Sequence, residues 1–471
     1  MPIHVVKSGD TLWRISAFYK VPITKIVEVN GLPDPNKLLI GQSLFIPSED
    51  VIHTIRAGET LWRIAQTYDT TVQAIAELNN ITNINSIYPG QILTIPAPRH
   101  RVQPGETLWR IAQGYGVPLQ ALLKANNIVN PNLVYPGTVL IIPRKQRPVI
   151  DVNGYIYHLG EQAVPIVRGD GKYLTYLSPF AYRIKEDGSL QQIDDTQAVQ
   201  TAYAERVVPM MSITNFTVSE LGENLAHIVL DSPEIQERLL TNIVNTMKGK
   251  GYRGLNIDFE NVLPADRIPY NQFLQRAVDQ LHAEGFFVST ALAPKASATQ
   301  VGLLYEAHDY EAHGRIVDFV ILMTYEWGWR LGPPQAISPL NEIKRVLDYA
   351  VTVIPRDKIF FGFQLYARDW LLPHVRGQEA ETFSMQEAIL RALKYNVVIQ
   401  YDTKTDSPFY RYTDEQGRMH EVWFEDARSA QAKFDTVKAY NLKGISYWAL
   451  GYPFPANWTL LEDNFTIRKL I

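Results

Sequence analysis

The stretch Tyr252–Glu260 reads Tyr-Arg-Gly-Leu-Asn-Ile-Asp-Phe-Glu, and it places Asn256, Asp258 and Glu260 two residues apart. The residues between these three are apolar: Leu255, Ile257 and Phe259. Because side chains alternate faces along a strand, with about 6.6 Å between every second residue, one strand carries all three polar groups on one face. Two carboxyls that close raise the pKa of one of them, which lets it keep a proton near neutral pH. The stretch therefore predicts a strand that carries a general acid.

Bulk properties narrow the possible functions of the 471-residue chain, which is long enough for several domains. Its net charge of −4 offers no electrostatic attraction for nucleic acid or an anionic membrane. The absence of cysteine excludes disulfides, a thiol nucleophile and thiolate metal sites. The histidines show no metal-ligand spacing, and no apolar run approaches the roughly 18 residues of a membrane span. We expect a monomer without metal or other cofactor, with no nucleic-acid partner and no membrane insertion.

The first third of the chain repeats itself three times. The segment His4–Ile15 recurs as His53–Ile64 and as His100–Ile111, each time with a Gly, an Asp or Glu, and then Thr-Leu-Trp-Arg-Ile. The spacing of about 48 residues is typical of repeat arrays. Each unit predicts strand, helix, helix and strand, with the threonine as the N-cap of the first helix. The recurring Trp, Leu and Ile are expected to form the core of each unit.

These repeats resemble LysM modules, and the resemblance covers nearly all of residues 3–144. It implies three βααβ modules, over residues 1–49, 50–97 and 98–145, that bind β-1,4-linked N-acetylglucosamine chains such as peptidoglycan or chitin. Three weak modules in tandem gain avidity on a polymer. The implied groove lies between the Gly-Asp/Glu-Thr turn and the loop before the last strand. The implied glycan-binding residues are Gly9, Asp10, Thr11, Gly58, Glu59, Thr60, Gly105, Glu106 and Thr107.

After a short linker at residues 145–150, apolar strand-like runs alternate with amphipathic helical stretches such as Ala427–Tyr440. This alternation predicts a parallel sheet covered by helices. Strands are predicted near Gly154–Leu159, Leu174–Tyr182, Val207–Ile213, Gly254–Glu260, Phe286–Ala291, Val317–Tyr325, Ile359–Tyr366 and Gly444–Leu450. Eight strands in about 320 residues predict a (β/α)8 TIM barrel of the α/β class over residues 150–471. The last gap is too long for one helix, which predicts a small α+β insertion at about residues 369–425.

In such a barrel the chemistry gathers where the strands end. Several predicted strands end in polar or aromatic residues: Asn256-x-Asp258-x-Glu260, Met323-Thr324-Tyr325-Glu326-Trp327, Gln364-Leu365-Tyr366 and Tyr447-Trp448. This set resembles glycoside hydrolase family 18, whose fourth strand carries Asp-x-x-Asp-x-Asp-x-Glu. The last two carboxylates are intact. The chain departs from the family at Arg253 and Asn256, which replace the first two aspartates, at Glu326, where many members have Asp, and at Ser212–Asn215, which replaces Ser-x-Gly-Gly.

The resemblance implies a substrate-assisted mechanism, in which the 2-acetamido oxygen of the sugar attacks its own anomeric carbon. In the implied catalytic set, Glu260 protonates the leaving oxygen and later activates water. Asp258 orients the acetamido N–H and stabilises the oxazolinium cation, and Tyr325 donates to the acetamido oxygen. Trp448 forms the floor, and Asn256 holds Asp258 in place. The implied substrate-binding residues are Asn256, Glu326, Trp327, Gln364, Tyr366, Trp448 and Phe180.

The order of the parts, LysM modules and then this barrel, resembles the spore cortex-lytic N-acetylglucosaminidases of spore-forming bacteria. It implies cleavage after N-acetylglucosamine in cortex glycan during germination, at the coat–cortex boundary or in the cell wall. In cortex many muramic residues are closed as a lactam, so N-acetylglucosamine alone keeps a free acetamido arm. The N-terminus shows no secretory signal, so we expect another route to that place. Two alternatives stay open: a chitinase or general cell-wall glucosaminidase, and a non-catalytic glycan-binding or coat protein.

Overall fold

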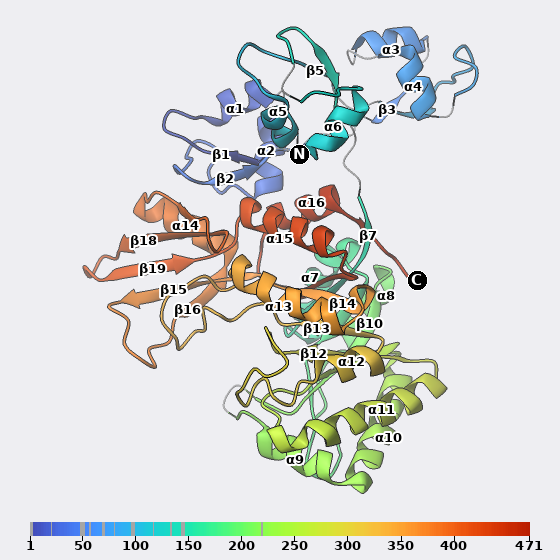
Figure 1. The fold of residues 1–471 in the computed structure, drawn as a ribbon, viewed down its shortest axis with the longest axis vertical. Coiled ribbons are helices and arrows are strands. Elements are labelled where there is room, and N and C mark those ends of the chain that lie inside the picture. The colour runs from blue at the N-terminus through green and yellow to red at the C-terminus, as the bar shows by residue number, and fades with distance from the viewer. Residues whose placement is uncertain are drawn as a thin grey trace. The chain divides into compact units, whose positions relative to one another are not determined.

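The computed structural model describes residues 3–19, 21–47, 52–55, 58–67, 71–79, 81–95, 99–115, 117–131, 134–142, 147–217 and 220–471. The chain forms two compact units (Figure 1). One unit comprises Met1–His4, Asp10–Asn30 and Leu44–Arg147, and the other comprises Val5–Gly9, Gly31–Ser43 and Pro148–Ile471.

Each of the three repeats folds into two helices and a two-stranded sheet, as the sequence predicts. Their elements are β1 (Ile3–Val5), α1 (Leu12–Tyr19), α2 (Ile23–Asn30) and β2 (Ser43–Phe45); β3 (Ile52–Thr54), α3 (Leu61–Thr67), α4 (Val72–Leu78) and β4 (Ile92–Thr94); β5 (Arg99–Arg101), α5 (Leu108–Gly114), α6 (Leu119–Ala125) and β6 (Val139–Ile141). The hydroxyl oxygen of each predicted N-cap threonine accepts a hydrogen bond from the backbone N–H three residues on, at 3.2 to 3.3 Å. The helices therefore begin where the capping pattern places them.

The recurring tryptophan is not a core residue, which corrects the sequence-based expectation. Leu12, Leu61 and Leu108 are buried, but the exposed fractions of the adjacent Trp13, Trp62 and Trp109 are 71%, 63% and 56%. The leucine is the first residue after the N-cap threonine and the tryptophan is the second, and only one face of such a short helix is covered by the module. The leucine and the isoleucine three residues later occupy that face. The tryptophan therefore points to solvent in all three modules.

The larger unit contains a closed barrel of eight parallel strands, which confirms the predicted (β/α)8 fold. In order around the barrel the strands are β7 (Val149–Ile156), β8 (Tyr176–Pro179), β10 (Val208–Thr214), β11 (Gly254–Asp258), β12 (Phe287–Leu292), β13 (Phe319–Leu322), β14 (Ile359–Gln364) and β20 (Gly444–Trp448). Strand β20 pairs with β7 and closes the ring. Two short strands, β9 (Tyr182–Arg183) and β21 (Thr466–Ile467), pair with β10 and β7.

Helices follow most of the barrel strands and cover the outside of the sheet (Figure 1). They are α7 (Ala163–Asp170), α8 (Thr196–Ala204), α9 (Glu223–Asp231), α10 (Pro233–Lys250), α11 (Arg267–Ala283), α12 (Tyr310–Ile316), α13 (Leu340–Val353), α15 (Ala427–Tyr440) and α16 (Pro455–Asn464). Large side chains fill the barrel, among them Tyr155, Tyr176, Phe319 and Phe360. The barrel is therefore a packed core, and its site must lie at a rim.

The predicted α+β insertion is present between the last two barrel strands. Five antiparallel strands form one sheet in the order β16-β15-β19-β18-β17, and the helix α14 lies beside it (Figure 1). Their bounds are β15 (Tyr366–Leu372), β16 (Glu381–Ser384), α14 (Met385–Tyr395), β17 (Gln400–Asp402), β18 (Ser407–Thr413) and β19 (Met419–Trp423). Strand β15 starts only two residues after β14 ends, so the insertion grows directly out of the barrel's carboxyl-end rim.

The first barrel strand lies earlier in the chain than predicted. Strand β7 spans Val149–Ile156, whereas the sequence pattern suggested Gly154–Leu159 with a linker before it. The polar Asp151 and Asn153 make the early part of this strand look like a loop. Both side chains are buried in the barrel, where each has a partner: Asp151 pairs with Arg468 at 3.0 Å, and Asn153 donates to the Ser446 hydroxyl at 2.9 Å.

Candidate active site

The acidic residues lie at the rim formed by the carboxyl ends of the barrel strands. Strand β11 ends at Asp258, and its pairing with β10 stops there, at the Thr214–Asp258 pair. Its pairing with β12 stops one residue earlier, at Ile257. Glu260 follows two residues beyond Asp258, on the same face of the extended chain. This is the rim at which (β/α)8 barrels carry their sites.

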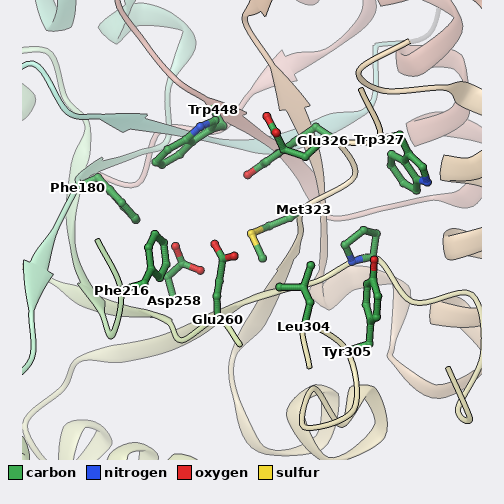
Figure 2. Close-up of a pocket in the computed structure, with 12 residues that line it drawn as sticks. Phe180, Phe216, Asp258, Glu260, Leu304, Tyr305, Met323, Glu326, Trp327 and Trp448 are labelled. Atoms are coloured by element: carbon green, nitrogen blue, oxygen red, sulfur yellow. The ribbon is translucent and has the colours of Figure 1, made fainter. Parts of the chain in front are cut away.

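A pocket of about 230 Å³ opens above this rim (Figure 2). Its residues come from the ends of several barrel strands and from the loops that follow them. They are Phe180, Phe216, Asp258, Glu260, Pro294, Leu304, Tyr305, Met323, Tyr325, Glu326, Trp327 and Trp448. Figure 2 shows the carboxylates of Asp258 and Glu260 side by side, with Trp448 and Phe180 toward one end and Trp327 and Tyr305 toward the other. An apolar cleft with a few convergent polar groups is typical of a small-molecule or sugar site.

The pocket brings together seven of the residues singled out from the sequence: Phe180, Asp258, Glu260, Tyr325, Glu326, Trp327 and Trp448. The sequence reasoning missed five others: Phe216, Pro294, Leu304, Tyr305 and Met323. Of these five, only Met323 carried a usable signal, because it opens the stretch Met323-Thr324-Tyr325-Glu326-Trp327 that follows β13. The loop with Leu304 and Tyr305 shows no periodicity, so nothing in the sequence places it over the site.

Three expected substrate-binding residues lie behind the pocket instead of lining it. Asn256, Gln364 and Tyr366 are all buried. Gln364 donates to Glu425 at 2.9 Å, and the Tyr366 hydroxyl donates to Glu326. These side chains therefore support the wall, and they correct the expectation of direct contact with the ligand.

Asn256 also does not hold Asp258 as expected. Its side-chain oxygen accepts from the Tyr155 hydroxyl at 2.7 Å, and its nitrogen donates to the Ser289 hydroxyl at 3.0 Å. The Oδ1 atom of Asp258 is buried and has no hydrogen-bond partner among the described residues. The amide of Asn256 thus ties β11 to β7 and β12, and the neighbouring carboxylate is left free toward the pocket.

The carboxyl groups of Asp258 and Glu260 both have raised pKa values. Burial raises the pKa of Asp258 well above its usual range, and the charge of Glu260 adds to this. Burial and then the charge of Glu326 raise the pKa of Glu260 to about 7. A carboxylic acid with such a pKa holds a proton at near-neutral pH and releases it readily, which is what general acid and base catalysis needs.

The third carboxylate of the pocket is held by a cation. Arg368, on β15 of the insertion, donates to both oxygens of Glu326 at 2.8 and 2.9 Å and also to the Gly328 carbonyl. The Tyr366 hydroxyl donates to the same carboxylate. A bidentate arginine pair fixes both the charge and the direction of a carboxylate. Glu326 is therefore both a pocket residue and an ion-pair partner.

Aromatic side chains complete the pocket. Trp448 packs edge-on against Phe180 at 4.7 Å and against Tyr155 at 5.4 Å between ring centroids. Burial and the nearby carboxylates raise the pKa of Tyr325, so its hydroxyl stays protonated and can donate to a ligand. Flat rings suit the apolar faces of sugars.

Two side chains also bind the backbone of Phe259 and Glu260. The Asn215 oxygen accepts from the N–H of Glu260 at 2.9 Å, and its nitrogen donates to the Glu260 carbonyl at 2.8 Å. The ring of His308 contacts the Phe259 carbonyl through Nε2 at 2.9 Å. No local sequence pattern predicts these contacts, because they join segments far apart in the chain.

The LysM turns share one arrangement where the structure describes them. Gly9, Gly58 and Gly105 all have φ between 83° and 84°, a conformation that favours glycine. In the first module His4 bonds Asp10 at 2.9 Å, and in the third His100 bonds Glu106 at 2.6 Å. The acidic residue of the expected glycan turn is therefore fixed by a histidine from the first strand.

Comparison with known proteins agrees with the geometry. The model of glycosyl hydrolases family 18 matches residues 173–452, and the LysM domain model matches residues 4–47, 53–96 and 100–143. The chain belongs to glycosyl hydrolases family 18. It is therefore a glycoside hydrolase, and this family 18 barrel follows three LysM domains.

The chain is similar to several proteins from spore-forming bacteria, two of them along its whole length. It is 46% identical over 475 residues to the cortical fragment-lytic enzyme of Bacillus subtilis (strain 168), covering 100% of this chain and 99% of that protein. It is 44% identical over 311 residues to the enzyme of the same name from Bacillus cereus, covering 66% and 72%. The crystal structure of the Bacillus megaterium QM B1551 spore cortex-lytic enzyme SleL matches with a TM-score of 0.80 at 37% identity, covering 100% and 99%.

Among the described residues, no group of three or more His, Asp or Glu side chains is arranged to hold a metal ion. No described helix is long and apolar enough to span a membrane.

Proposed function

We propose that this family 18 enzyme cleaves the β-1,4 bond after N-acetylglucosamine in spore cortex peptidoglycan by a substrate-assisted retaining mechanism. The observation that carries the proposal is the pair Asp258 and Glu260, two buried carboxyls with raised pKa values at the rim of an aromatic pocket. The names of the similar proteins, cortical fragment-lytic and spore cortex-lytic enzymes, support the choice of substrate.

The ion pair between Glu326 and Arg368 argues against a nucleophile supplied by the protein. A retaining glycosidase with two carboxylates uses one as acid and the other as nucleophile, about 5 Å apart. Asp258 and Glu260 lie two residues apart on one extended segment, so both face the substrate from the same side. Glu326 is the remaining carboxylate that lines the pocket, and both its oxygens are bound by Arg368. The attacking atom is then best supplied by the acetamido group of the substrate.

The roles of the residues follow from their positions. Glu260 gives its proton to the leaving oxygen and then takes one from the attacking water. Asp258, whose Oδ1 is free, accepts from the acetamido N–H and stabilises the positive charge that forms on the ring. The Tyr325 hydroxyl donates to the acetamido oxygen and aims it at the anomeric carbon. Trp448 packs under the distorted sugar.

The LysM modules hold the enzyme on its polymer. Their turns, Gly9–Thr11, Gly58–Thr60 and Gly105–Thr107, bind N-acetylglucosamine units, and tandem binding raises the local concentration of glycan. This anchoring serves spore germination, when cortex is degraded at the coat–cortex boundary.

The decisive test compares three glycans with one enzyme preparation. Purified cortex fragments, chitin oligosaccharides and de-N-acetylated cortex are digested, and mass spectrometry identifies the new reducing end. We expect N-acetylglucosamine at that end, a faster reaction on cortex than on chitin, and no reaction after de-N-acetylation. Glu260→Gln serves as the control, with turnover reduced by about 10²-fold or more and glycan binding retained. Equal hydrolysis of de-N-acetylated glycan would refute the mechanism, and faster hydrolysis of chitin would refute the substrate.

A further inference from the structure

The backbone that carries Glu260 lies beyond the support of the barrel ladder. Strand β11 ends at Asp258, and its last pairs with β10 and β12 involve Asp258 and Ile257. Asn261, the residue after Glu260, has φ of 53°, in the left-handed region. The peptide units around Glu260 therefore leave the sheet just where the acid must be aimed most accurately.

The side chain of Asn215 takes over from the ladder on one side. Its amide makes two hydrogen bonds with the same residue, accepting from the N–H of Glu260 at 2.9 Å and donating to its carbonyl at 2.8 Å. It also donates to the Gly222 carbonyl at 3.0 Å. Asn215 is fully buried and follows the last residue of β10. In place of a backbone partner, a side-chain amide continues the strand pairing past Asp258.

His308 holds the preceding peptide unit from the other side. Its Nδ1 accepts from the N–H of Ala293 at 2.9 Å, which leaves the proton on Nε2 to be donated to the Phe259 carbonyl at 2.9 Å. Burial lowers the pKa of His308 to about 4, so the ring stays neutral in the pH range of interest. The Nε2–H group therefore stays available as a donor over this pH range, and its bond to the Phe259 carbonyl links the end of β11 to the loop after β12.

We propose that Asn215 and His308 are positioning residues that fix the backbone of Phe259 and Glu260 and so aim the acid at the reacting bond. The inference rests on the proposed role of Glu260. The family pattern on this strand is Ser-x-Gly-Gly, and Asn215 stands at its last glycine. A glycine at this position would have no side chain and could not make these bonds, so the clamp depends on the asparagine amide.

The expected effect is on catalysis more than on binding. A misplacement of about 1 Å at a reacting group costs up to about 10²-fold in rate. We therefore expect Asn215→Ala to lower kcat by about 10- to 100-fold and to change KM by less than about twofold. Asn215 does not line the pocket, so its loss leaves the sugar contacts in place.

Asn464→Ala is the matched control. Asn464 is equally buried and donates to the Leu460 carbonyl at 2.8 Å, but it lies on α16 and does not line the pocket. Both variants lose a buried amide with a backbone partner, so similar falls in Tm are expected. His308→Gln keeps a donor near the position of Nε2, and His308→Leu removes it, so the glutamine variant should retain the higher kcat.

Four measurements on the full chain decide the matter: kcat, KM, Tm and amide hydrogen exchange in the peptide that contains Glu260. We expect faster exchange at Glu260 in Asn215→Ala and not in Asn464→Ala. An Asn215→Ala variant with unchanged kcat and unchanged exchange would overturn the proposal, and so would equal loss of kcat in both alanine variants. If the unmodified enzyme does not hydrolyse N-acetylglucosamine glycans, the proposed function fails, while the exchange measurement still tests the clamp.

Discussion

The pKa of Glu260 should respond to the charge of Glu326, and the direction of the response is fixed by the structure. Burial and then Glu326 raise this pKa from 4.5 to about 7. The acid must be protonated to act, so kcat/KM falls as pH rises through this value. Glu326→Gln removes the second cause, lowers the pKa of Glu260, and moves the basic limb of the pH profile to lower pH.

The size of this shift in the pH profile follows from the relative weight of the two causes that raise the pKa of Glu260. The whole rise is about 2.5, and Glu326 contributes less than burial does. Its share is therefore at most about one pH unit, or about 1.4 kcal/mol. The Arg368 pair and the partial exposure of Glu326 reduce the effect further. We expect the limb to move down by about 0.5 to 1 pH unit.

A second variant should move the same limb the other way. Arg368→Met removes the cation that compensates Glu326, so the negative charge acts more strongly on Glu260 and its pKa rises. Arg391→Met is the control, because Arg391 is also a partly buried arginine of the insertion but pairs with Asp369 and Glu381. It should leave the limb where it is.

The assay is initial-rate hydrolysis of a soluble N-acetylglucosamine oligosaccharide between pH 4 and pH 9, fitted for kcat/KM. The groups around Glu260 that could titrate or carry charge are Asp258, Glu326, Tyr155, Tyr325 and Tyr270. The pKa values of the three tyrosines are raised, so they stay neutral throughout. If Glu326→Gln leaves the limb in place or moves it upward, the assignment of Glu260 as the titrating acid is refuted.

Three further results are expected. Glu260→Gln should stabilise the fold by about 1–3 kcal/mol at pH 8 and not at pH 4. The reason is that a carboxyl group whose pKa is raised in the folded state destabilises that state above its unfolded pKa. Urea unfolding at both pH values checks this prediction. Asn256→Asp places a further carboxyl in a fully buried position and should cost about 1–3 kcal/mol at pH 8 and less at pH 5 in the same assay, since protonation removes the charge. Leu108→Ala should lower the free energy of unfolding of the third module by about 2–4 kcal/mol, and Trp109→Ala by less than about 0.5 kcal/mol, as measured by urea unfolding; equal losses would place the tryptophan in the core after all.

Regular patterns in the sequence were enough to predict most of the fold. The two-residue spacing of Asn256, Asp258 and Glu260 located β11, and the helix predicted at Ala427–Tyr440 has the same bounds in α15. The start of β7 was wrong because Asp151 and Asn153 are polar, and polar residues mark loops in most sequences. Here they are buried with partners from β20 and from the chain end, which only the closed barrel brings near.

The site was predictable where one strand carried it and unpredictable where several segments meet. Asp258 and Glu260 could be predicted from their alternation on one strand together with the resemblance of the strand ends to family 18. The burial of Asn256 does not, because its partners Tyr155 and Ser289 come from other strands. The same holds for Asn215, whose two bonds to Glu260 join residues 45 positions apart. A pattern along the chain reports which face a side chain takes, and tertiary contacts decide what it touches there.

Among the carboxyl groups of the pocket, only Glu326 has a described cationic partner, and this distribution of charge suits the proposed chemistry. Glu326 has Arg368 as its cation, but no described ion pair involves Asp258 or Glu260. Burial raises the pKa values of both carboxyls, the charge of Glu260 adds to the rise at Asp258, and the charge of Glu326 adds to the rise at Glu260. Once Glu260 has given up its proton, the site holds net negative charge beside the ring of Trp448. A positive charge forming on the substrate at that moment is stabilised by both the carboxylates and the ring. The site is thus best matched to the transition state, when the sugar carries the missing cation.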